Sequence, residues 1–168
     1  WQVAEGGQWS KSDDAQENQV TSAEEPQIVP SGLIDDIRAA DAAGLRRIAV
    51  AAAREALKWT GGEDITANAL IDVVEDGLYG PSNERDMLQV LTVETDERYW
   101  AAVDAAEAAG DQDALEAATK IFCRARAFLS CWYAADPDGL KAAMESVYEA
   151  ITATNNAKLI ARAVHRVI

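Results

Sequence analysis

The stretch 115–135, LEAATKIFCRARAFLSCWYAA, decides the fold because it is the most completely apolar segment of the chain. Its apolar residues recur at spacings of three and four, which is the period of an amphipathic α-helix. Polar residues mark the opposite side as far as Arg126, and beyond it that side reads Ser130, Cys131 and Ala134. We therefore expect a core helix, enclosed on all sides in its second half, around which the other helices pack.

Two further expectations concern this helix. Cys123 and Cys131, the two cysteines of the chain, lie about 12 Å apart along a helix, whereas a disulfide needs Cα atoms within about 7 Å. Two reduced thiols favour a cytoplasmic location. Five large side chains of the helix should be buried, namely Leu115, Phe122, Phe128, Leu129 and Trp132.

The remainder of the 168-residue chain is also helical in its pattern. Start signals such as Asp64, Asp111 and Asp136 and stop signals such as Gly110 predict an all-α fold, a single compact bundle of about six or seven helices over residues 31–168. No run of about 18 uncharged apolar residues is present, so we expect no membrane span. The expected helices cover 31–44, 45–59, 64–78, 83–93, 95–109, 112–135, 137–154 and 155–168, of which the first two join if Gly44 does not break them.

Residues 1–30 differ in composition from the rest of the chain. They hold six acidic residues against Lys11 and show no sustained apolar period. Such a segment cannot bury enough apolar surface to offset the entropy of ordering it. We expect a disordered acidic arm or linker, with order beginning near Ser31 as a helix N-cap.

Two segments of the chain match each other at an offset of 66 residues: 39–44, AADAAG, and 105–110, AAEAAG. Each reads as a helix, a glycine stop and a return helix, which gives the bundle helical-hairpin repeat character. The second copy with its flanks resembles a helical hairpin of the tetratricopeptide type, in which small residues let antiparallel helices approach closely. The tyrosine and proline landmarks of that family are missing, and its period is about 34 residues.

The negative charge is concentrated in one part of the chain. Of the net charge of −14, the segment 63–116 carries −13, because it holds fifteen acidic residues against Arg85 and Arg98. Acids in the first turn of a helix are stabilised by the helix dipole, which accounts for some of them. Acids without such a position should repel one another, so a partner-binding acidic face is one interpretation and a solvated surface is the other.

We predict from this charge a non-catalytic protein that binds a basic partner protein, as an immunity protein, an inhibitor or a DNA mimic does. A helical adaptor or structural subunit of a larger assembly is the alternative. The sequence leaves the oligomeric state open. The acids chosen as partner contacts are those that lack a capping position in the expected helices, namely Asp72, Glu75, Asp76, Glu84 and Asp86.

Catalytic signatures are missing from the sequence, which contains no nucleophile elbow, phosphate-binding loop or dinucleotide fingerprint. Acidic pairs three residues apart do occur, and such pairs place two carboxylates on one helix face. Glu94-Thr95-Asp96-Glu97 is similar to the ExxE half of the metal site in all-helical nucleotide pyrophosphatases of the MazG type. That resemblance implies a Mg²⁺-dependent enzyme as a second alternative, although the later pairs have Asp before Glu and Thr95 reads as a helix cap. We expect no catalysis and no cofactor.

Basic residues occur at helical spacing outside the acidic segment. They could form a stripe for nucleic acid, but the net charge opposes binding to phosphates, so we expect no direct nucleic-acid contact. The two groups are Arg46, Arg47, Arg54 and Lys58, and Lys158, Arg162 and Arg166.

Overall fold

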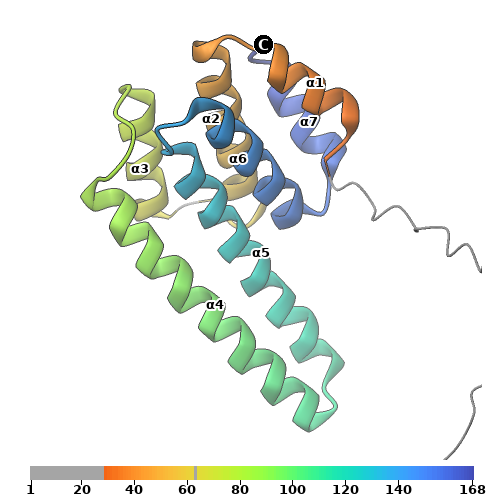
Figure 1. Ribbon diagram of the computed structural model, residues 1–168. Coiled ribbons are helices and arrows are strands. Elements are labelled where there is room, and N and C mark those ends of the chain that lie inside the picture. The colour runs from red at the N-terminus through yellow and green to blue at the C-terminus, as the bar shows by residue number, and fades with distance from the viewer. Residues whose placement is uncertain (1–28, 63) are drawn as a thin grey trace, which may run out of the picture.

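The computed structural model describes residues 29–62 and 64–168 (Figure 1). Within these two stretches the chain forms α-helices and no strand, so the predicted all-α bundle is confirmed. The predicted arm lies outside the described residues except for Val29, which is buried in the core, and Pro30. The helices are α1 (Ser31–Ala39), α2 (Ala42–Trp59), α3 (Ile65–Glu75), α4 (Asn83–Ala109), α5 (Gln112–Ala134), α6 (Gly139–Thr154) and α7 (Ala157–His165).

Helices α2, α5 and α6 form the centre of the bundle, and each packs against the other two. Helix α2 presents buried alanines such as Ala52 and Ala56, whose small side chains let neighbouring helices approach closely. Helices α5 and α6 are also joined by two buried hydrogen bonds. The hydroxyl of Ser130 donates to the carbonyl of Ser146 at 2.8 Å, and the hydroxyl of Ser146 donates to the carbonyl of Ser130 at 2.9 Å.

The second half of α5 is largely buried, but it is not enclosed on all sides as the sequence predicted. Ala127, Phe128, Ser130, Cys131 and Ala134 are all buried. The burial prediction for the large side chains was correct for Phe128, which is 1% exposed, and wrong for the others to differing degrees. Leu115, Phe122, Leu129 and Trp132 are each partly exposed.

A long α4–α5 hairpin explains the partial exposure of Leu115 and Phe122. It extends away from the other helices at its turn end (Figure 1). There the two helices face each other through small residues such as Ala106 and Ala118, which are buried. Helix α5 therefore has a buried second half in the bundle and a first half covered mainly by α4.

Helix α4 corrects the predicted division at Thr95. Residues 83–93 and 95–109 were expected to be two helices, but they form one helix of 27 residues. Thr95 is 3% exposed, and its hydroxyl donates to the carbonyl of Leu91 at 2.6 Å. A threonine that bonds back to residue i−4 has its polar group satisfied inside a helix, so it need not act as a cap.

Other helix ends also differ from the sequence interpretation. Ser31 lies inside α1, whose N-cap is Pro30 without a side-chain bond. Asp138 caps α6 in place of Asp136, accepting from the Lys141 amide at 3.1 Å. Gly44 lies inside α2, whereas Gly110 ends α4 with φ 64°. The two similar segments thus have different structures. None of the helices in the described stretches is long and apolar enough to cross a membrane.

Candidate functional site

Two of the five predicted contact residues, Asp72 and Glu75, already form ion pairs with an arginine of this chain. Arg54 of α2 donates to Glu75 of α3 at 3.0 and 2.8 Å and to Asp72 at 3.3 Å. These contacts, led by the hydrogen bonds to Glu75, raise the pKa of Arg54 above its ordinary value. This pairing was not predicted, because Arg54 lies 18 to 21 residues away along the chain.

The other three predicted contacts occupy helix ends. Asp76 is the C-terminal cap residue of α3. Glu84 and Asp86 lie in the first turn of α4, where the helix dipole favours negative charge. The argument that selected them, the lack of a helix-terminal position, is therefore wrong for Glu84 and Asp86. Their role as partner contacts stays a prediction.

The acidic pairs do not gather into a metal site. Glu94 and Glu97 share α4 without a break at Thr95, which removes one departure from the pyrophosphatase pattern. However, residues 29–62 and 64–168 contain no group of three or more His, Cys, Asp or Glu side chains that could hold a metal ion. Burial raises the pKa of the Cys131 thiol, which keeps it protonated and unreactive.

The surface that the sequence analysis missed is the side of α4 that faces away from the bundle. Its inner side is set by Leu88, Thr92, Thr95 and Ala106, which are buried at spacings of three, four and eleven residues. The opposite side combines apolar and acidic residues within about 140° of arc, at about 100° per residue. We call this set the α4 outer face: Met87, Val90, Val93, Glu94, Glu97, Trp100 and Asp104.

The apolar members of the α4 outer face are strongly exposed. Met87 is 60% exposed, Val90 58%, Val93 52% and Trp100 61%. Packing among residues 29–62 and 64–168 leaves these side chains uncovered. This face was not predicted, because α4 was expected to be two helices divided at Thr95. One continuous period through Leu88 and Thr95 would have placed Met87 and Trp100 outside.

The acids of the α4 outer face have no cationic partner. In the described part of the chain, no salt bridge involves Glu94, Glu97 or Asp104. Of the two bases in the acidic segment, Arg85 is turned inward: its guanidinium stacks over Trp132 at 4.0 Å, and its side chain is 11% exposed. The α4 outer face therefore combines unpaired carboxylates with exposed apolar side chains.

The acidic character continues to the end of the hairpin. The stretch 99–119 contains no basic residue. Asp104 and Glu107 are exposed on α4, and Asp113 and Glu116 are exposed on α5. Asp111, which the sequence predicted as a cap, accepts from the Ala114 amide at 3.0 Å. The protruding end thus carries a single sign of charge.

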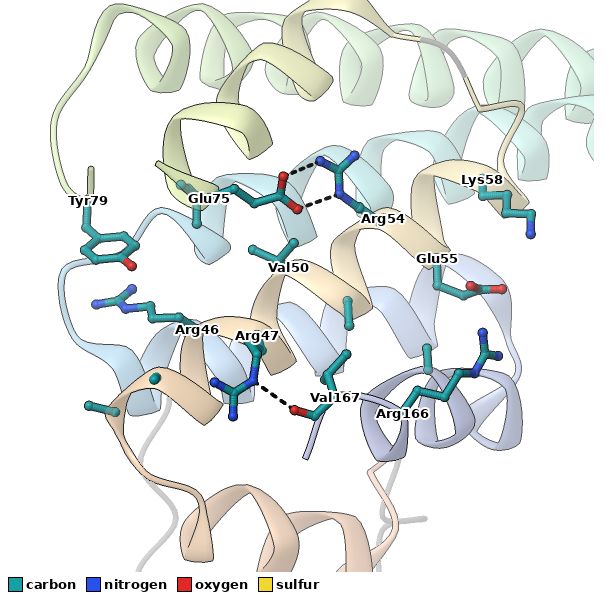
Figure 2. Close-up of a pocket in the computed structure, with 15 residues that line it drawn as sticks. Arg46, Arg47, Val50, Arg54, Glu55, Lys58, Glu75, Tyr79, Arg166 and Val167 are labelled. Carbon is teal, nitrogen blue, oxygen red and sulfur yellow. Dashed lines mark hydrogen bonds and ion pairs between the residues drawn. The ribbon is translucent and has the colours of Figure 1, made fainter. Parts of the chain in front are cut away.

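Basic residues from both predicted stripes line a groove elsewhere on the bundle (Figure 2). Helix α2 forms its floor, while α3 with Tyr79 and the end of α7 form its walls. The groove has a volume of about 940 Å³. Its floor includes Val50 and Ala51, and its charged residues are Arg46, Arg47, Arg54, Lys58 and Arg166 against Glu55 and Glu75.

The cations of this groove differ in how they are held. Arg46 donates to the carbonyls of Asp136 and Pro137, and its guanidinium stacks over Tyr79 at 3.8 Å. Arg47 donates to the Val167 carbonyl at 2.9 Å. Neither is neutralised by a carboxylate in the described residues, unlike Arg54. The groove keeps a positive charge on a negatively charged molecule.

No protein family, curated protein or solved structure was found to match this chain. The function of the protein is therefore inferred from its own residues.

Proposed function

We propose that this is a non-catalytic cytoplasmic protein that binds a positively charged partner protein through the α4 outer face. The observation that carries the proposal is the alternation, on one helix face, of exposed apolar side chains with unpaired carboxylates. The acidic end of the hairpin extends the same negative field. A cytoplasmic location suits the free thiols of Cys123 and Cys131.

The exposed apolar side chains distinguish this face from a merely solvated surface. Single exposed apolar residues are common on proteins, whereas a contiguous apolar patch marks an interaction site. Met87 and Trp100 are separated by about 20 Å along the helix at 1.5 Å per residue. This length suits a partner helix or groove that takes anchors at spacings of three and four.

The two parts of the face have different roles in binding. The carboxylates steer a basic partner and exclude acidic competitors, which raises the association rate more than the final affinity. The apolar side chains contribute to the affinity, because their surface is removed from water when the partner binds. If this protein inhibits a basic partner, the binding should depend strongly on the carboxylates. The adaptor alternative would depend mainly on Val90, Val93 and Trp100.

Capture from the native host tests the proposal. The tagged full chain is used as bait at about 0.15 M salt, and bound proteins are identified by mass spectrometry. We expect Val90→Ser with Val93→Ser to lose the captured protein. The matched control, Ile65→Ser with Leu78→Ser, changes two apolar residues that are 89% and 64% exposed elsewhere, and it should retain that protein.

A charge reversal separates the two roles. Glu97→Lys should weaken capture of a basic partner, whereas Asp35→Lys makes the same charge change on α1 and should not. If Glu97→Lys has no effect on capture but Val90→Ser with Val93→Ser abolishes it, the adaptor function is supported. If all four variants retain the captured protein, the α4 outer face is not its binding site.

A further inference from the structure

The groove over α2 and the α4 outer face are opposite in character. The groove over α2 is lined by five cations and two carboxylates, with Val50 and Ala51 on its floor. The α4 outer face carries acids and exposed apolar side chains. No described residue of α4 lines the groove. The groove therefore carries the positive charge that complements the negative charge of the α4 outer face.

The two surfaces also match in length. Arg46 and Lys58 mark the ends of the charged part of α2, and they lie about 18 Å apart at 1.5 Å per residue. Glu94 and Asp104 lie about 15 Å apart on α4 by the same rise. Between these ends the groove presents its apolar floor, and the α4 outer face presents Trp100.

We propose that the groove of one copy of this chain binds the α4 outer face of a second copy. The proposal rests on the docking role of that face in the proposed function, and it names one partner for it. The α4–α5 hairpin protrudes from the bundle (Figure 1), which makes its outer face available to a neighbour. The contact joins two different surfaces, so it is heterologous and can continue from copy to copy.

Net charge limits the strength of this contact. Each copy carries −14, and whole molecules repel each other at low salt. At about 0.15 M salt the screening length is about 8 Å, so nearby opposite charges count more than distant like charges. A single helix face in a groove makes a small interface, for which we expect weak association.

The test is sedimentation velocity of the full chain from about 5 to 500 μM, a range set by that weak-interface expectation, at about 0.15 M salt. The groove variant is Lys58→Glu with Arg166→Glu, two exposed residues that form no salt bridge in the described stretches. Its control is Arg38→Glu with Lys158→Glu, which makes the same change in net charge at a last-turn base of α1 and at a base of α7, neither of which lines the groove.

The face variant is Glu94→Lys with Glu97→Lys. Its control is Asp35→Lys with Glu145→Lys, which makes the same change in net charge on α1 and α6, at residues that neither line the groove nor form a salt bridge in the described stretches. We expect the wild type and both controls to increase in mass with concentration from the monomer mass of 18.1 kDa. The groove variant and the face variant should each remain monomeric.

Mixing the two defective variants gives the decisive result. The groove variant retains an intact face, and the face variant retains an intact groove, so the mixture should form a one-to-one dimer and nothing larger. A wild type that stays monomeric overturns the proposal, and then segment 1–28 or an acidic partner remains as an occupant of the groove. Association that persists in either variant, or a mixture that stays monomeric, also overturns it. If the host partner is still captured, the proposed function survives that failure.

Discussion

Replacing Glu149 by glutamine should stabilise the protein at neutral pH and change little near pH 4. Burial raises the pKa of Glu149 from 4.5 to about 6, although Arg126 lowers it in part. The side chain of Glu149 is 9% exposed, and its Oε2 lies 3.8 Å from Arg126 Nη1 without a hydrogen-bond partner. Arg126 is meanwhile held by Asp96 at 2.7 Å, so it keeps a carboxylate partner in the variant.

The magnitude follows from the pKa difference between the folded and unfolded states. Below pH 4.5 the carboxyl is protonated in both states and causes no penalty. As the pH rises through about 6, the folded state must ionise a buried group, so wild-type stability falls. A difference of about 1.5 pKa units corresponds to about 2 kcal/mol at most, and partial solvent screening reduces it to about 1–2 kcal/mol.

Urea denaturation at pH 4, 5, 6, 7 and 8 measures this effect. The difference in unfolding free energy between Glu149→Gln and the wild type should grow over pH 4.5–6 and then level off. The control Glu145→Gln removes a neighbouring carboxylate on the same helix and should give a much smaller change. A pH-independent difference for Glu149→Gln, or one that shrinks as the pH rises, would refute the reasoning.

Three further predictions concern packing and backbone geometry, each measured as the change in unfolding free energy. Phe128→Ala should cost about 3–5 kcal/mol because Phe128 is fully buried, whereas Phe122→Ala should cost about 1–2 kcal/mol because Phe122 is partly exposed. Equal costs would show that the first half of α5 belongs to the core. Gly110→Ala should cost about 1 kcal/mol from its positive φ alone, since no atom lies within 4 Å of the added Cβ. Ser130→Ala should cost about 1–2 kcal/mol by removing the buried hydrogen bond to Ser146, and an unchanged stability would contradict that role.

The helical period made the centre of the bundle predictable from sequence. The run from Ala127 to Ala134 contains no charged residue, and five of its eight residues are buried in the structure. The period could not tell how far along α5 the bundle extends. Leu115 and Phe122 repeat with the core residues, but the helices near them are fewer. Burial in that half depends on which helices reach it, which is a tertiary property.

The error at Thr95 had a local physical cause, whereas those in the site came from contacts between residues distant in the chain. Threonine favours helix caps, yet it can also bond back to the preceding turn, and the sequence does not show which option is used. Arg54 pairs with Glu75, and Arg46 and Arg166 line the same groove. Both arrangements bring together residues that are distant in the chain. The α4 outer face was predictable, because a single period through Leu88 and Thr95 fixes its direction.

Carboxylate and tryptophan footprinting of the captured complex tests the central claim most directly, because it reports side-chain exposure residue by residue. The full chain is labelled alone and with its host partner, and modification is quantified by mass spectrometry. We predict that Glu94, Glu97 and Trp100 become protected on binding, while Asp35 and Trp59 keep their labelling. Unchanged labelling of all three α4 residues in a complex that remains assembled would contradict the claim.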